Sequence, residues 1–329
     1  MRSVMVVGMI LIVSGTIAQN ATDWVSPLPK KIAFGETAIV PVAELGVTLG
    51  DGAGDVVATA REQIVTMLEE KTGVRPEGSG FEILLGVCDE RGTIGDLSVP
   101  GASELARLKN SDQAYVIRPM GNDRLVVAGL TEQAVFHGAI TVKWLLAAGI
   151  EGDTVTIPLA RVTDWPDISE RGEWGGSANG DIQRFADEKM NLIESHCRLS
   201  MADDGRGEGS IGEDFVEEAR LHAIKVVPIL THLDQLKGTG IYDTYPELKG
   251  IGGTSTALGG RVMAPCASKP KFTEILGDWL ASLATMKGVD TVCCWLSEHH
   301  VQCGCDDCQQ VGQYVLEAQS LVKGWENAR

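Results

Sequence analysis

Basic residues are scarce in this sequence. It has 28 Lys and Arg residues against 45 Asp and Glu residues, which gives a net charge of −17, and the basic residues do not cluster. Proteins hold nucleic acids through clustered Lys and Arg side chains, because these neutralise the phosphates. We therefore expect no nucleic-acid partner.

Long apolar runs are also lacking. The apolar run from Val4 to Val13 follows Arg2 and is shorter than the roughly 20 residues that a membrane-spanning helix needs. With the small residues Thr16 and Ala18 after it, it has the pattern of a secretory signal. We expect residues 1–18 to be a signal peptide and the mature protein to be exported to the periplasm or the extracellular space, without a membrane span.

The sequence does not have the evenly spaced cysteines of a small disulfide-stapled fold. Three of its eight cysteines stand alone, and the other five crowd into one short stretch. The isolated ones are Cys88, Cys197 and Cys266, and the crowded ones are Cys293, Cys294, Cys303, Cys305 and Cys308.

The chain does have the composition of a globular protein, and its 329 residues suffice for two domains. After a linker at residues 19–29, strand and helix patterns mix over residues 30–163, which predicts one small α/β domain. The strands are expected at residues 37–45, 81–88, 114–119 and 124–129, and the helices at 55–71 and 131–148. The last two strands are predicted to form a hairpin.

From residue 164 to residue 329, strand and helix patterns alternate. Strands are expected at residues 171–175, 191–199, 225–232 and 289–296, and helices at 181–190, 212–223, 271–287 and 307–327. Residues 233–270 are expected to form a long loop rich in Gly and Thr. Repeated βα units predict a parallel sheet, and a TIM barrel has eight of them. We therefore expect the first four βα units of a (β/α)8 TIM barrel that continues beyond this sequence.

Glu298 is the first candidate for catalysis. The apolar run that begins at Val289 ends abruptly in the sequence Ser297-Glu298-His299-His300. In βα folds, the residues just past the C-terminal ends of the strands carry the chemistry. The alternative is that Glu298 is a solvated residue at the start of the next helix.

A group of soft metal ligands follows Glu298 directly. His299 and His300 precede Cys303, Cys305 and Cys308 in the pattern H-H-x2-C-x-C-x2-C. Zinc prefers four sulfur and nitrogen ligands in a tetrahedron, so the three cysteines and one of the two histidines are predicted to hold a structural zinc ion. The spacing from Cys303 favours His299, and His300 is the alternative ligand. A disulfide between two of the cysteines is the alternative, because an exported protein forms disulfides readily.

The order and spacing of four segments resemble glycoside hydrolase family 20, the β-N-acetylhexosaminidases, and their relatives with the same N-terminal domain, the family 67 α-glucuronidases. The segments are Leu125–Leu146, Ile157–Gly172, Lys225–Leu233 and Ala264–Pro270. The resemblance implies a non-catalytic zincin-like domain over residues 30–163 and a partial catalytic TIM barrel over residues 164–329. It also implies a glycan or oligosaccharide as substrate and no cofactor for catalysis.

The resemblance further implies roles for single residues. Glu298 would be the general acid and base on the glycosidic oxygen, and we expect it to share one opening with Arg171, whose planar guanidinium would bind sugar hydroxyls. The other implied substrate contacts are Trp174, His196, His232, Trp295 and Ser297. Each of these residue types also has a plain structural role, as a surface arginine, a packed tryptophan or a core histidine.

Ser297 departs from the family pattern, in which an Asp immediately precedes the catalytic Glu. That Asp stabilises the charge that develops on the substrate's own acetamido nucleophile, and a neutral hydroxyl cannot do so. The sequence thus favours a secreted glycoside hydrolase of altered specificity. Its second carboxylate would lie on an absent half, as in an α-glucuronidase-like enzyme. The alternative is a non-catalytic relative that binds carbohydrate or metal.

Overall fold

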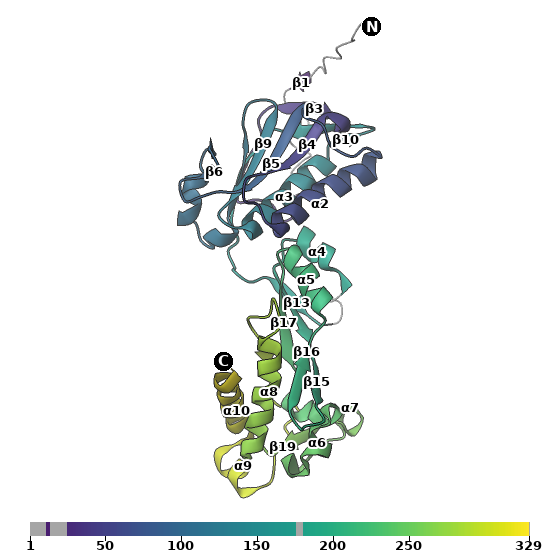
Figure 1. Ribbon diagram of the computed structural model, residues 1–329, viewed down its shortest axis with the longest axis vertical. Helices are drawn as coiled ribbons and strands as arrows, with labels where there is room; N and C mark the ends of the chain where they lie inside the picture. The colour runs from purple at the N-terminus through teal and green to yellow at the C-terminus, as the bar shows by residue number, and fades with distance from the viewer. Residues whose placement is uncertain (1–10, 14–24, 176–179, 329) are drawn as a thin grey trace. The chain divides into compact units, whose positions relative to one another are not determined.

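The computed structural model describes residues 11–13, 25–175 and 180–328 of the chain (Figure 1). These residues divide into two compact units. The first contains the described residues up to Arg171 with Ile182–Asn191 and Leu221–Ile224, and the second contains the rest. Most of the predicted signal peptide and part of the linker lie outside the described residues.

A six-stranded sheet forms the centre of the first unit, in the order β2-β12-β8-β9-β5-β4. Its strands are β2 (Lys31–Ala33), β4 (Leu45–Leu49), β5 (Phe81–Val87), β8 (Tyr115–Pro119), β9 (Arg124–Gly129) and β12 (Arg161–Asp164). The strands β4, β5 and β9 run parallel, whereas β8 pairs antiparallel with β9 and β12. The predicted hairpin of β8 and β9 is therefore confirmed.

Two long helices cover one face of this sheet, as Figure 1 shows: α2 (Asp55–Thr72) and α3 (Glu132–Ala147). Both agree with the predicted helices. The Thr131 hydroxyl accepts the backbone N–H of Ala134 at 3.2 Å and so caps α3. Gly73, with a φ of 72°, ends α2. Apolar side chains of the two helices and of β5, β8 and β9 form the main core of this unit.

A second apolar cluster lies on the opposite face of the sheet. The buried side chains of Val116 and Val126 pack there against a segment with little regular structure. Its short elements are β6 (Thr93–Ile94), β7 (Leu97–Ser98), η3 (Ala102–Arg107) and η4 (Ser111–Gln113). Because both faces are covered, the central strands β8 and β9 are almost continuously apolar.

The strand predicted at residues 37–45 is two strands in different sheets. β3 (Thr37–Pro41) belongs to a four-stranded sheet of order β1-β3-β11-β10, and η2 (Val42–Glu44) then leads the chain into β4. Pro41 has no N–H for a sheet hydrogen bond, which explains the break at this point. The remaining strands of the small sheet are β1 (Leu11–Val13), β10 (Ile150–Glu151) and β11 (Thr154–Pro158).

A four-stranded parallel sheet forms the centre of the second unit. Its order, β13-β14-β17-β20, is the order of the strands in the chain, as expected for half of a (β/α)8 barrel. The strands are β13 (Gly172–Trp174), β14 (Leu192–His196), β17 (Lys225–Leu230) and β20 (Cys293–Cys294). The helices that follow them in the chain are α4 (Ile182–Asp187), which belongs to the first unit, and then α5 (Glu213–Leu221), α8 (Pro270–Ala284), α9 (Asp306–Val311) and α10 (Gln313–Ala328).

Four parts of the second unit differ from the sequence predictions. The fourth strand is only two residues long, and the last helix breaks at Gly312, where φ is 100°. The expected loop at 233–270 contains short helices and the hairpin β18–β19. Its elements are η6 (Leu233–Thr239), α6 (Ile241–Thr244), η7 (Pro246–Leu248), β18 (Lys249–Thr254), α7 (Ala257–Gly260) and β19 (Met263–Pro265). A further hairpin, β15 (Arg198–Met201) with β16 (Gly207–Ser210), follows β14.

The core of the second unit lies around α8, whose side chains Phe272, Leu276 and Trp279 are fully buried. α10 packs against α8 where Gly277 faces Gly324. A Cβ atom added to Gly324 would lie 3.0 Å from the backbone nitrogen of Gly277, so the two helix backbones approach closely. This contact fixes the position of α10, which carries Gln313 and Glu317, two buried polar residues of the candidate site.

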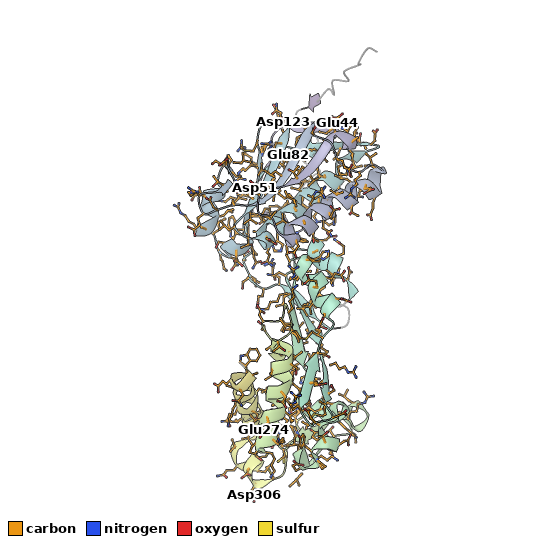
Figure 2. All side chains as sticks on the ribbon, viewed as in Figure 1. Glu44, Asp51, Glu82, Asp123, Glu274 and Asp306 are labelled. Atoms are coloured by element: carbon orange, nitrogen blue, oxygen red, sulfur yellow. The ribbon has the colours of Figure 1, made fainter. Side chains whose placement is uncertain are left out.

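The surfaces of both units carry acidic side chains, as Figure 2 shows. Glu44, Asp51 and Asp123 are exposed on the first unit, and Glu274 and Asp306 on the second. Within the described residues, no helix combines the length and the apolar character needed to cross a lipid bilayer.

Candidate functional site

A pocket lies just past the C-terminal ends of the parallel strands of the second unit. Its volume is about 680 Å³. Trp174 ends β13, His196 ends β14, and His232 follows β17, so neighbouring strands each contribute a side chain. The other residues of the pocket lining are Gln235, Leu258, Cys294, Trp295, Leu296 and Glu298. Residues in this position carry the chemistry of βα barrels.

Trp295 forms the apolar wall of the pocket. Its ring lies edge-on to the rings of Trp174 and His196, with centroid distances of 5.2 and 5.1 Å, and 4.6 Å from the ring of His232. Trp174 is 60% exposed, so its ring is open to a ligand. Large rings beside a few polar groups are typical of pockets that bind small molecules. Four of the predicted site residues therefore come together here.

Glu298 lies in this pocket, with half of its side chain exposed. Its Oε2 lies 3.3 Å from Nε2 of His232, and its Oε1 accepts a hydrogen bond from Gln235 at 3.3 Å. Nδ1 of His232 lies 2.8 Å from the backbone oxygen of Leu296 and must donate a proton to it. Nε2 of His232 and the Glu298 carboxyl can therefore hold one proton between them.

Asp234, in η6, fixes the turn that carries Glu298. Its side chain is fully buried, and its Oδ2 accepts the backbone N–H groups of Glu298 and His299 at 3.2 and 3.0 Å. The same oxygen lies 3.0 Å from Nδ1 of His299. Its Oδ1 has no hydrogen-bond partner within the described residues. Sequence reasoning missed Asp234, although it stands only two residues after His232, at the end of a predicted strand.

Ser297 is buried and faces α10. Its hydroxyl donates to Oε1 of Glu317 at 2.6 Å, and its backbone N–H donates to Oε2 at 3.0 Å. Glu317 is fully buried and also accepts a hydrogen bond from the side chain of Gln313 at 2.7 Å. Ser297 thus uses both of its polar groups on Glu317, and it is not among the residues that line the pocket. Neither Glu317 nor Gln313 was predicted, because both lie within an amphipathic helix pattern.

The structure does not bring Arg171 to Glu298. β13 and β20 belong to one parallel sheet. Arg171 precedes β13, at the N-terminal end of the strands, whereas Glu298 follows β20, at their C-terminal end. The guanidinium of Arg171 donates to the side-chain oxygen of Gln113 at 2.9 Å and to the backbone oxygen of Lys189 at 2.8 Å, all within the first unit. Burial lowers the pKa of Arg171. These contacts fit a residue that stabilises the first unit.

Four cysteine thiols form a second cluster. The Sγ atoms of Cys266, Cys303, Cys305 and Cys308 all lie within 4.8 Å of one another. The fourth thiol is that of Cys266, in place of the predicted His299, because the ring of His299 is held by Asp234. All eight cysteines are free, so the described residues contain no disulfide.

The environments of these thiols differ. A hydrogen bond from the backbone N–H of Cys308 lowers the pKa of Cys305 to about 6. Burial instead raises the pKa of Cys266 to about 12. Cys303 and Cys308 are buried, whereas Cys305 is half-buried. The cluster therefore joins a stabilised thiolate at Cys305 to the thiols of Cys266 and Cys308, whose pKa values burial raises.

The structure is similar to solved enzymes of glycoside hydrolase family 20. An exo-β-N-acetylglucosaminidase from Vibrio harveyi, in complex with N-acetylglucosamine, is 13% identical with a TM-score of 0.65, over 94% of this chain and 53% of that chain. An N-acetyl-β-hexosaminidase from Streptomyces plicatus is 16% identical with a TM-score of 0.64, over 93% of this chain and 64% of that chain. No protein-family model and no curated protein matches the sequence.

A chitobiase from Flavobacterium johnsoniae gives a similar result, with 12% identity and a TM-score of 0.61 over 92% of this chain and 50% of that chain. The chain thus spans between half and about two thirds of the length of these structures. At such low identity, the likeness is one of fold. The chain has the mixed α/β fold of the family 20 β-N-acetylhexosaminidases, including the parallel half-barrel sheet of its second unit.

Proposed function

We propose that this chain is part of an exported glycoside hydrolase that cleaves glycosidic bonds of a polysaccharide or glycan, with Glu298 as general acid and base. The observation that supports this most is the pairing of Glu298 with His232 beside Trp295, at the C-terminal ends of parallel strands. A proton held between a carboxyl and an imidazole is available for transfer to a leaving oxygen. The family 20 fold supports the same chemistry.

In the proposed reaction, a sugar ring packs against Trp174 and Trp295, which are open to the pocket. Glu298 gives its proton to the glycosidic oxygen as the bond breaks and later takes a proton from the attacking water. The hydrogen bonds of Asp234 to the backbone of Glu298 and His299 hold the acid in place during both steps. Glu298 is the only carboxylate among the described residues that line the pocket. The second carboxylate of the reaction would therefore come from a residue outside this lining.

We further propose that the substrate is a hexoside whose cleavage does not use its own acetamido group. Acetamido assistance requires a carboxylate beside the reacting sugar. Ser297 stands where the family pattern has this carboxylate, and its hydroxyl is bound to buried Glu317. This argument favours a relative of the β-hexosaminidases with altered specificity, of which an α-glucuronidase-like hydrolase is one form.

Replacement of Glu298 by Gln tests the proposed acid. The variant keeps the shape of the side chain and loses the proton, so hydrolysis of an unactivated oligosaccharide should fall by about 100-fold or more. Aryl glycosides with good leaving groups should lose less. Glu247→Gln removes the same charge from an exposed position on η7 and serves as the control. Equal turnover by wild type and Glu298→Gln on every accepted glycoside would exclude Glu298 as the acid.

A non-catalytic glycan-binding protein is the second candidate, because Glu298 is the only carboxylate among the described residues that line the pocket. Binding without turnover would identify it. Titration with oligosaccharides, followed by tryptophan fluorescence, should then show saturable quenching in the absence of any released reducing sugar. Trp174→Ala should weaken this binding, while Val322→Ala, an exposed apolar residue on α10, should not.

Export is proposed from the N-terminal sequence pattern alone. Expression of the gene with its own N-terminus should yield a secreted protein that begins at or near Gln19. N-terminal sequencing of the secreted fraction measures this directly. Retention of residues 1–18 in the mature protein would argue against a cleaved signal.

A further inference from the structure

We propose that Cys266, Cys303, Cys305 and Cys308 bind one zinc ion in a closed structural site. This inference is independent of the proposed glycosidase activity. Zinc takes four thiolates at about 2.3 Å in a tetrahedron, which sets the sulfurs about 3.8 Å apart. The Sγ atoms of Cys266 and Cys305 are 3.7 Å apart, and all four lie within 4.8 Å of one another. The thiols are thus already close to the arrangement that the ion requires.

The four ligands come from two separate parts of the chain. Cys266 lies between β19 and α8, whereas Cys303 lies in the loop after β20, and Cys305 and Cys308 lie at the start of α9. Asp306, labelled in Figure 2, is the first residue of that helix. An ion at this position would connect the segment before α8 to the loop that follows Glu298. Such a connection between distant segments is typical of structural zinc sites.

Hydrogen bonds hold both segments around the thiols. The side chain of Gln313, which is almost fully buried, accepts the backbone N–H of Cys303 at 3.1 Å and donates to the backbone oxygen of Pro265 at 2.9 Å. The backbone N–H of Ile251 points to Sγ of Cys303 at 3.4 Å, and the hydroxyl of Ser268 lies 3.5 Å from Sγ of Cys266. Donors of this kind stabilise metal-bound thiolates.

The arrangement favours zinc over a disulfide. A disulfide bond holds two sulfurs about 2.05 Å apart and leaves the other two thiols unused. Here all four sulfurs lie within 4.8 Å of one another, and Cys266, Cys303 and Cys308 are buried. Four protein ligands also leave no open position for water or substrate, so the site would be structural and not catalytic.

The proposed ion would also support the turn that carries Glu298. Gln313 connects the loop at Cys303 to Glu317, and Glu317 holds both polar groups of Ser297, the residue before Glu298. Loss of the ion should therefore loosen the chain from Ser297 to Cys308. On binding, each thiol that is still protonated releases its proton to solvent, so zinc affinity should fall as the pH is lowered.

The test is elemental analysis of the full chain, purified under reducing conditions without a chelator. We expect about one zinc per chain in the wild type. Cys266→Ser should lose the zinc, while His299→Ala, which removes the ligand predicted from the sequence, should keep it. Cys197→Ser is the control for an isolated cysteine outside the cluster. Zinc retained by Cys266→Ser and lost from His299→Ala would overturn the proposed ligand set.

A second measurement avoids variants that fail to fold. Titration of the metal-free wild type with Co²⁺ should give the intense visible and near-ultraviolet bands of a tetrahedral tetrathiolate, with a sharp end point at about one equivalent. Zinc should then abolish these bands. No such bands, or a disulfide among the four cysteines found by mass spectrometry of the protein as purified without reductant, would overturn the proposal. Iron in place of zinc, visible as a coloured protein, would overturn the choice of metal.

Discussion

Nε2 of His232 lies 3.3 Å from Oε2 of Glu298, while Nδ1 of the same ring lies 2.8 Å from the backbone oxygen of Leu296. The backbone oxygen can only accept a hydrogen bond, so the ring must present Nε2 to the carboxyl. The ring of His232 also packs against Trp295, which restricts its rotation. The orientation of the His232 ring beside Glu298 is therefore fixed by two contacts, with the backbone oxygen of Leu296 and with the ring of Trp295.

Replacement of His232 by Phe should preserve the packing against Trp295 and remove the proton partner of Glu298. We expect hydrolysis to fall by about 10- to 100-fold, and the pH–rate profile to change, because the variant removes the imidazole that lies 3.3 Å from the Glu298 carboxyl. His222→Phe, a histidine of the first unit, is the control. An unchanged pH–rate profile would show that His232 has only a structural role.

Replacement of Ser297 by Asp should destabilise the protein, because it places a second carboxylate against buried Glu317. Ser297→Ala, the matched control, loses one hydrogen bond and should cost about 1–3 kcal/mol. The Asp variant should cost more, about 3 kcal/mol or above, because it buries an unpaired charge. Urea unfolding measures both. Equal stability of the two variants would contradict this account of Ser297.

Lys189 should make stability depend on pH in the alkaline range. Burial lowers the pKa of its ammonium group to about 8, against an opposing effect of nearby Asp164. Between about pH 8 and pH 10.5, the unfolded chain keeps a proton that the folded chain has released, so the free energy of unfolding rises with pH. The full rise from this group would be about 3 kcal/mol.

Lys189→Met should remove this rise, and Lys71→Met, an exposed lysine, should keep it. The measurement should stop near pH 10, because burial and the charge of Asp164 raise the pKa of Tyr115. Above pH 10 the unfolded chain releases the tyrosine proton first, and stability then falls with pH. A slope that survives in Lys189→Met would assign the effect to another group.

Gln313→Leu should weaken both folding and metal binding. Gln313 bridges the backbone at Cys303 and Pro265, and it also donates to Glu317. We expect a loss of about 1–3 kcal/mol in the free energy of unfolding and a 10- to 100-fold lower zinc affinity. Gln309→Leu is the control, because the side chain of this exposed residue makes a single hydrogen bond, to the backbone oxygen of Cys303. Equal zinc affinity in the two variants would limit the role of Gln313 to packing.

The periodic parts of the fold could be predicted from the sequence. The helices α2 and α3, the hairpin β8–β9 and the parallel order of β13, β14 and β17 all follow from apolar spacing, which side-chain burial dictates. The hairpin β18–β19 could not be predicted. Its first strand, KGIGGT, is half glycine, and glycine gives no side-chain alternation to detect.

The candidate site was predictable only where its residues follow strands. Trp174, His196, His232 and Glu298 each stand at or just past the C-terminal end of a parallel strand, and they meet in one pocket. Glu317 and Cys266 come from other elements, and only tertiary packing brings them to Ser297 and to the other three cysteines. Neighbours of this kind leave no local pattern in a single sequence.

The contact of Gly277 with Gly324 has a consequence for how this protein tolerates change. Where two helices touch through side chains, a substitution can be absorbed by a new rotamer, but two bare backbones have no rotamers to adjust. A Cβ atom at Gly324 would lie 3.0 Å from the backbone nitrogen of Gly277, and one at Gly277 would lie 3.3 Å from the backbone oxygen of Gly324, so a side chain at either position would require the two helices to shift by a few tenths of an ångström. Such a shift would move Glu317, which lies on α10, relative to Ser297, the residue before Glu298. The two glycines lie outside the pocket, but they thereby influence where Glu298 lies.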